Sequence, residues 1–101
     1  MSSLTTHKSE ELNEVTLDVQ GDFTYQLHRD FREAYRNEPL GTTYIINLFK
    51  TEYMDSAALG MLLLLREHAG GDNAKISIKG CREGLRKIFS IAQFDKLFQV
   101  I

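Results

Sequence analysis

Residues 43–60 read TYIINLFKTEYMDSAALG, and their pattern indicates the fold class of the chain. Its first six residues are nearly all apolar or β-branched, which is typical of a central strand buried on both faces of a sheet. A polar turn follows, and Asp55 or Ser56 then caps a helix that we expect over about 57–69. Strand, turn and helix in this order predict one repeating unit of an α/β protein.

The segments on either side repeat this alternation of strand and helix. Apolar and polar residues alternate through 14–20 (EVTLDVQ) and 75–79 (KISIK), and this period of two predicts half-buried strands. The remaining predicted elements are a helix over roughly 25–37 capped by Thr24, a helix over about 82–92, a last strand at 97–101, and a start at 1–12 that is either flexible or a short edge strand. We therefore expect a single α/β domain over 1–101 with crossover connections.

Composition limits the classes of function. The chain has 12 Lys and Arg against 14 Asp and Glu, and the net charge of −2 argues against direct binding of nucleic acid or of an anionic membrane. The single cysteine excludes an intrachain disulfide, and the longest apolar run is far too short to span a bilayer. The N-terminus has no basic-then-apolar signal pattern. These observations predict a cytoplasmic protein without a membrane span.

Charge is distributed unevenly along the chain. Residues 1–55 hold five basic and ten acidic side chains, whereas residues 56–101 hold seven and four. Most of the basic side chains in the second half lie between residues 75 and 87, at Lys75, Lys79, Arg82, Arg86 and Lys87. These residues are either a solvated helix face with strand-end lysines or a docking surface for an acidic partner.

The residues that most enzymes require are missing or isolated. The three histidines are scattered, no glycine-rich phosphate-binding pattern occurs, and Cys81 lacks the partner of a CxxC motif. Asp22, Asp55 and Cys81 remain as candidates, and no second catalytic residue can be named for any of them. The sequence therefore predicts a protein that is not an enzyme and that needs neither metal nor cofactor.

Ser56 admits two interpretations. Its hydroxyl can act as a helix cap, which stabilises a helix by ~1 kcal/mol. Alternatively it accepts a phosphate, because free amide groups and the positive end of the helix dipole stabilise an anion at this position. A phosphoserine adds about −1.5 to −2 charge, and that charge would oppose docking at an apolar surface.

The helix after Ser56 is more apolar than a single buried stripe requires. Ala57, Ala58, Leu59 and the run 61–65 cover more than half of its circumference. Either part of this apolar surface is left for a partner, or the helix is fully buried between the sheet and a neighbouring helix.

Residues 47–60 resemble the phosphorylation motif of the anti-sigma factor antagonists, the STAS-domain family. Members of that family typically read N/D-L-x(4)-F/Y-M/I-D-S-S/T-G/A-L-G, and this chain has NLFKTEYMDSAALG. Residues 19–23 (VQGDF) resemble the family's L-x-G-E-L/I, and residues 76–100 resemble its C-terminal strand–helix–strand region. Ala57 replaces the usual second hydroxyl, which leaves Ser56 as the only acceptor in the motif.

The resemblance implies a single STAS-like domain with a mixed sheet of four to five strands and about three helices packed mainly on one face. It also implies a regulator of bacterial partner switching. Such a protein, when unphosphorylated, binds a serine kinase or anti-sigma factor of the histidine-kinase-like ATPase type and frees that regulator's client, commonly a sigma factor. Phosphorylation at Ser56 would block this binding, and a PP2C-type phosphatase would reverse it.

The same resemblance implies which residues contact the partner. Ser56 carries the switch, and Asp55 orients its loop or its hydroxyl. The implied partner-binding residues are Gly21, Asp22, Asp55, Ser56, Ala57, Ala58, Leu59, Gly60 and Met61. An alternative remains a STAS-like module that senses a nucleotide or a lipid at the helix start and regulates an output other than a sigma factor.

Overall fold

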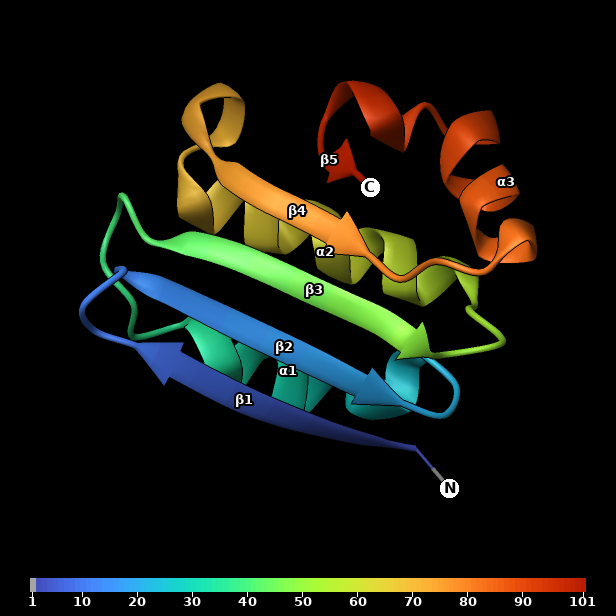
Figure 1. Cartoon of the computed structure of the whole chain (residues 1–101), viewed down its shortest axis with the longest axis horizontal. Helices are drawn as coiled ribbons and strands as arrows, with labels where there is room; N and C mark the ends of the chain where they lie inside the picture. The colour runs from blue at the N-terminus through green and yellow to red at the C-terminus, as the bar shows by residue number, and fades with distance from the viewer. Residues whose placement is uncertain (1) are drawn as a thin grey trace.

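Five strands lie side by side in the order β1-β2-β3-β4-β5 in the computed structural model, which describes residues 2–101 (Figure 1). β1 runs antiparallel to β2, and the pairs β2–β3, β3–β4 and β4–β5 are parallel. The sheet is thus mixed, and the expectation of four to five strands is confirmed. The strands span Ser3–Ser9 (β1), Glu14–Gln20 (β2), Thr43–Lys50 (β3), Lys75–Lys79 (β4) and Gln99–Val100 (β5).

The helices connect successive parallel strands. Because β2, β3 and β4 are adjacent in chain order, right-handed crossovers place the two intervening helices on the same face of the sheet. Figure 1 shows α1 and α2 together behind the sheet, whereas α3 stands beyond β4 near β5. The α-helices span His28–Tyr35 (α1), Ser56–Ala69 (α2) and Glu83–Ile91 (α3), and short 3-10 turns cover Tyr25–Leu27 (η1), Gly71–Asn73 (η2) and Phe94–Lys96 (η3).

One face of the sheet forms the hydrophobic core. Alternate residues of the central strands point toward α1 and α2 and are fully buried, as the period of two predicts. Helix residues pack against them from the other side. The core includes Val15, Leu17, Val19, Tyr44, Ile46 and Leu48 from the sheet, and Phe31, Ala58, Leu62 and Leu65 from the helices.

The prediction that β3 is buried on both faces is wrong. Ile45 and Asn47 alternate with the core residues and are only half-buried, on a face that neither α1 nor α2 covers. The physical reason is the strand order, since both crossovers place their helices on the opposite face. This uncovered face carries polar side chains from the neighbouring strands, such as Asp18 on β2 and Lys79 on β4.

Two further expectations need correction. The helix predicted over 25–37 is divided into η1 and the shorter α1, and the Thr24 side chain makes no capping hydrogen bond. The last strand is shorter than 97–101 because η3 occupies the residues just before it. Across the described part of the chain, every helix falls short of the length and apolarity that a membrane crossing requires.

Candidate functional site

Two loops meet at the carboxyl ends of β2 and β3, where parallel α/β proteins form their binding sites. Loop 21–24 leads into η1 and α1, and loop 51–55 leads into α2. The amide of Gly21 donates to the Lys50 carbonyl at 3.2 Å, and that of Phe23 donates to the Tyr53 carbonyl at 2.9 Å. In return, the Asp55 amide donates to the Phe23 carbonyl at 3.3 Å. The two loops are therefore joined through their backbones.

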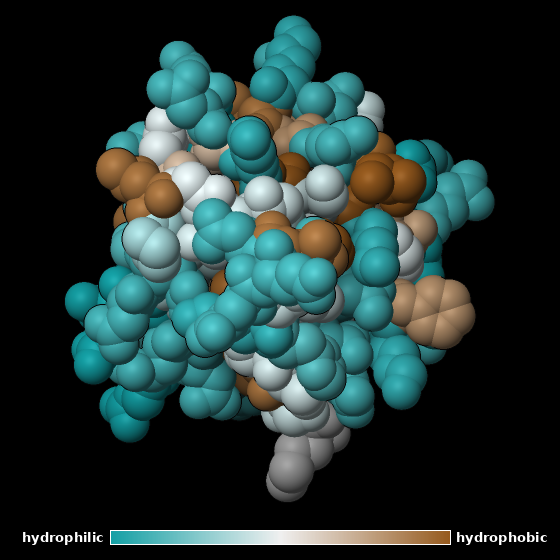
Figure 2. All heavy atoms as spheres, turned by 60° about the vertical axis from the view of Figure 1, so that its left-hand side comes forward, coloured by the Kyte–Doolittle hydropathy of each residue, from teal (hydrophilic) through white to brown (hydrophobic). Residues whose placement is uncertain are grey.

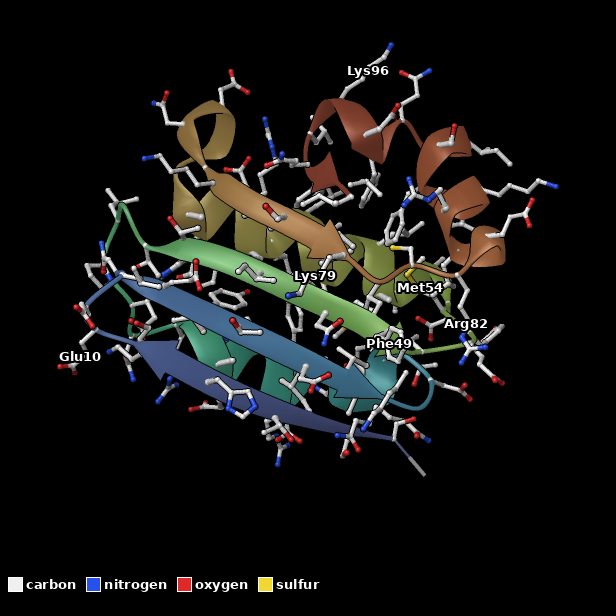
Figure 3. The ribbon with its side chains drawn as sticks, viewed as in Figure 1. Glu10, Phe49, Met54, Lys79, Arg82 and Lys96 are labelled. Carbon is white, nitrogen blue, oxygen red and sulfur yellow. The ribbon has the colours of Figure 1, made fainter. Side chains whose placement is uncertain are left out.

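Buried side chains hold this pair of loops against the core. Phe23 and Met54 are buried and form an isolated parallel bridge. Thr51 is fully buried, and its hydroxyl donates to the Val19 carbonyl at 3.2 Å. The loops thus present a fixed surface at this end of the sheet. Figure 3 shows Phe49, Met54 and Arg82 at this end and Glu10 at the opposite one.

Asp55 caps both helices that start at the site. Its Oδ1 accepts a hydrogen bond from the Ala58 amide at 2.9 Å, which identifies Asp55 rather than Ser56 as the N-cap of α2. Its Oδ2 accepts from the Tyr25 amide at 3.1 Å, at the start of η1. One carboxylate therefore takes the capping role that the sequence assigned to Thr24. Sequence reasoning missed this bridge because Asp55 and Tyr25 are 30 residues apart.

Ser56 is the first residue of α2 and is exposed. Its hydroxyl is not needed as a cap, because Asp55 supplies the capping oxygen. Among residues 2–101, no acceptor contacts the amides of Ser56 and Ala57, which belong to the unpaired first turn of the helix. An exposed hydroxyl thus lies beside free N–H donors and the positive end of the helix dipole.

The residues after Ser56 divide between surface and core. Ala57 and Leu59 are half-buried and Gly60 is exposed, whereas Ala58 is fully buried and Met61 is nearly so. The side chain of Ala58 is therefore unavailable to a partner, although the resemblance placed it on the partner-binding surface. Its small size instead lets α2 approach the sheet.

The surplus of apolar surface on α2 is real. Leu64 is 64% exposed and Leu63 is 40% exposed, so the alternative of full burial is excluded. On the other loop, Gly21 is half-buried in a left-handed conformation and Asp22 is exposed. Apart from Ala58, the implied partner-binding residues thus surround one end of the sheet and the first turns of α2.

Exposed aromatic side chains occur at the same end, and sequence reasoning did not single them out. Tyr25 follows loop 21–24, Phe49 lies at the end of β3, and Tyr53 lies in loop 51–55. Large exposed aromatic residues are enriched where proteins contact one another. The sequence signal was available, since Phe49 and Tyr53 interrupt an otherwise polar turn after a buried strand.

Two of the three candidate catalytic residues, Asp55 and Cys81, lack the environment that catalysis needs. Both oxygens of the Asp55 carboxylate accept backbone hydrogen bonds, which is a structural role. Cys81 is half-buried, and burial raises the pKa of its thiol, against the direction that a nucleophile requires. Within the described chain, no three His, Cys, Asp or Glu residues are grouped so as to hold a metal ion.

The basic residues of the second half are spread over several surfaces. Lys75 and Lys79 lie on the uncovered face of β4, and Arg86 and Lys87 are exposed on α3. Arg82 lies at the site end, where its Nη1 is 3.5 Å from Oε1 of Glu52 in loop 51–55.

Comparisons with known proteins identify the family. A family model described as "Mlab, STAS domain" matches residues 6–100. A STAS-domain containing protein of Pseudomonas aeruginosa (strain UCBPP-PA14) is 43% identical over 99 residues, covering 97% of this chain and 98% of that protein. The chain belongs to the STAS domain family.

Solved structures with the same fold include anti-sigma factor antagonists. One from Mycobacterium paratuberculosis has a TM-score of 0.82 at 15% identity, covering 99% of this chain and 85% of that one. SpoIIAA in its unphosphorylated form has a TM-score of 0.70 at 16% identity, over 88% and 83%. The phosphorylated Bacillus SpoIIAA gives 0.68 at 15% identity, over 98% and 91%. The expected α/β fold of a single STAS-like domain is thereby confirmed, and it is similar to that of SpoIIAA.

Proposed function

We propose that this protein is a phosphorylation-controlled regulator in a partner-switching pathway, with Ser56 as the phosphoacceptor. The observation that carries the proposal is the exposed Ser56 hydroxyl on the first residue of α2, freed from capping by the neighbouring Asp55. A kinase can reach such a hydroxyl without unfolding the helix. The likeness of the fold to SpoIIAA, known in unphosphorylated and phosphorylated forms, supports the same reading.

The phosphoryl transfer itself belongs to the partners. The Ser56 oxygen attacks the γ-phosphorus of ATP, ADP leaves, and the hydroxyl proton passes to the kinase or to solvent. A phosphatase of the PP2C type then hydrolyses the phosphate ester and restores the hydroxyl. This chain is the substrate of both reactions and catalyses neither.

Phosphorylation acts on binding through charge. The phosphate adds about −1.5 to −2 charge. The unpaired amides of Ser56 and Ala57 and the helix dipole stabilise that charge where it is formed. A partner docking over the same end of the sheet would have to desolvate the phosphate, and this cost favours release.

The unphosphorylated protein binds a serine kinase or anti-sigma factor of the histidine-kinase-like ATPase type, and this binding frees the client of that regulator. The proposed location is the cytoplasm, where ATP and such kinases are found. Gly21, Asp22 and the exposed residues around Ser56 are the proposed contact surface.

The proposal is tested with protein that carries phosphoserine at position 56, introduced during translation. We expect its affinity for the kinase-type regulator encoded nearby to fall at least about tenfold relative to unmodified protein. Phosphoserine placed at the exposed Ser90 on α3 is the matched control and should leave affinity unchanged. Equal affinity of the Ser56-phosphorylated and unmodified proteins would refute the switch.

The kinase reaction gives an independent measurement. Incubation with that regulator and ATP should add one phosphate to the wild-type protein, seen by intact mass, and none to Ser56→Ala. Equal phosphorylation of the two proteins would show that a residue other than Ser56 accepts the phosphate.

A further inference from the structure

A groove of about 520 Å³ runs between α1 and α2, beginning next to Ser56. Both helices follow parallel strands and start at the site end, so the groove extends from loop 21–24 toward the opposite end of the sheet. It is lined by Tyr25, His28, Phe31, Arg32 and Tyr35 on one side and by Ala57, Gly60, Met61 and Leu64 on the other.

The floor and one wall of this groove are apolar. Phe31, Tyr35 and Met61 are core residues whose outer edges form the floor. Leu64 forms part of the α2 wall and is 64% exposed. An apolar cleft with an exposed leucine on its wall is the kind of surface that another protein covers.

Gly60 gives a second reason to expect a partner here. A glycine inside a helix costs about 1 kcal/mol relative to alanine. A Cβ added at Gly60 would meet nothing within 4 Å, so packing within the chain does not require the glycine. The absent side chain instead leaves the α2 backbone open to close approach from outside, at the middle of the groove wall.

The other wall carries the guanidinium group of Arg32 as its charged lining group. Arg32 and His28 line the groove from α1, and Arg29 and Arg36 lie next to them on the outer side of the same helix. Arg36 pairs with Glu33 at 3.3 Å, but among the described residues neither Arg29 nor Arg32 has a carboxylate within salt-bridge distance. This wall therefore offers unpaired guanidinium groups to a partner.

The two helices that form the walls of the groove also favour a helical binding partner over an extended one. Both walls are α-helices, whose backbone groups are bonded internally. An extended segment in the groove would find no backbone partners, whereas a helix satisfies its own. α1 has 8 residues and is ~12 Å long, which matches about two turns of a docked helix.

We propose that the α1–α2 groove binds an amphipathic helix of a partner protein, with an apolar face against Leu64 and the outer edge of Met61 and a carboxylate-bearing flank against Arg32 and Arg29. This inference names the chemistry of the partner in the proposed switch, and it rests on that switch only for the effect of Ser56. The groove begins at Ala57, so a phosphate on Ser56 would lie at its mouth and repel an acidic helix.

A second copy of this chain is a poor occupant. Its exposed amphipathic helix is α3, where Ile88 and Ile91 are accessible. Arg86 and Lys87 lie on the same helix, and they would oppose Arg32 and Arg29 across the groove. Like charges in this arrangement disfavour the pairing.

The test uses two designed helical peptides of about 18 residues that share one leucine stripe, with either Glu or Lys along the flank. They are titrated into the unphosphorylated full-length chain, without any kinase, by fluorescence anisotropy and by amide chemical shifts. We expect the Glu peptide to bind at least about tenfold more tightly than the Lys peptide, with shifts confined to α1 and α2.

Variants locate the binding. Arg32→Glu should abolish or invert the preference for the Glu peptide, whereas Arg86→Glu, at a position on α3 that is also exposed, should keep it. Leu64→Ser should weaken both peptides about tenfold, and Ile91→Ser, at a position that is 82% exposed, should weaken neither. All four positions are at the surface, and thermal melts establish that the variants fold.

Three outcomes would overturn the proposal. The first is equal affinity of the two peptides, and the second is amide chemical-shift changes at residues outside the groove. The third is a dimer of the wild-type chain that Leu64→Ser dissociates, because a second copy of the chain would then occupy the groove. Since no kinase or phosphate is present, these outcomes leave the Ser56 switch untouched. Conversely, a chain that is never phosphorylated can still bind the Glu peptide.

Discussion

The two ends of the sheet use polar side chains differently. At the opposite end from Ser56, polar groups hold loops together: the Thr42 hydroxyl donates to the Pro39 carbonyl at 2.8 Å, and Lys8 pairs with Glu38 at 3.2 Å. The ring of His68 also bonds to the Glu38 carbonyl, through Nε2 at 3.0 Å. On the side that brings this end forward, Figure 2 shows hydrophobic residues only in small patches among hydrophilic ones.

At the Ser56 end, the Asp55 carboxylate and the Thr51 hydroxyl hold the loops. Asp55 joins the starts of two helices, and the surrounding surface keeps an unused serine hydroxyl, exposed aromatic side chains and an apolar groove. One end is therefore built for stability, whereas the other keeps reactive and apolar groups accessible, as a surface that binds partners requires. Three substitutions test this comparison.

Asp55→Ala should have the largest effect. It removes the acceptor of two backbone amides at once, and we expect the free energy of unfolding to fall by about 2–3 kcal/mol. Chemical denaturation measures this loss. The neighbouring Ser56→Ala and the predicted cap variant Thr24→Ala are the controls, and each should change stability by less than about 0.5 kcal/mol. A larger cost for either control than for Asp55→Ala would show that the cap has been misassigned.

Gly60→Ala should separate stability from binding. The new methyl group meets open space, so the helix should gain about 1 kcal/mol of stability. The same methyl group should weaken binding of the Glu peptide in the groove, measured in the titration described above. Gly84→Ala on α3, where a Cβ also meets nothing, should add stability without affecting the peptide. If Gly60→Ala binds as tightly as the wild type, close approach at this position plays no part.

Tyr44→Phe tests the stability end, and we expect the smallest effect there. The buried Tyr44 hydroxyl forms no hydrogen bond of good geometry among residues 2–101, although it interacts with the Thr42 side chain, so its removal should leave stability unchanged or raise it by up to about 1 kcal/mol. A loss of stability of more than about 1 kcal/mol in Tyr44→Phe would show that the hydroxyl makes a stabilising hydrogen bond.

The same variant should alter the dependence of stability on pH. Burial, with a contribution from Glu38, raises the pKa of Tyr44 from 10.0 to about 12. The unfolded chain therefore loses this proton at lower pH than the folded one, and stability present below pH 10 declines as the pH rises toward 12. Denaturation curves in this range should show a shallower decline for Tyr44→Phe than for the wild type.

Much of the fold could be predicted from local patterns in the sequence. The period of two through 14–20 and 75–79 located β2 and β4 to the residue, because a strand with one buried face must alternate. The glycine pair after Ala69 marked the end of α2, where Gly70 adopts the left-handed conformation of a helix C-cap. The apolar run of β3 was misread, since its half-buried Ile45 looks like a core residue in the sequence.

The α/β alternation, the STAS motif and the position of Ser56 at a helix start could be predicted from the sequence, because each depends on residues close together in the chain. The folded chain was needed to show that Asp55 caps two helices, that one face of the sheet stays uncovered, and that Leu64 and Arg32 lie across one groove. Hydrogen bonding and burial act between residues that are far apart in the chain. Which of these long-range contacts form depends on how the crossover connections place the helices next to one another.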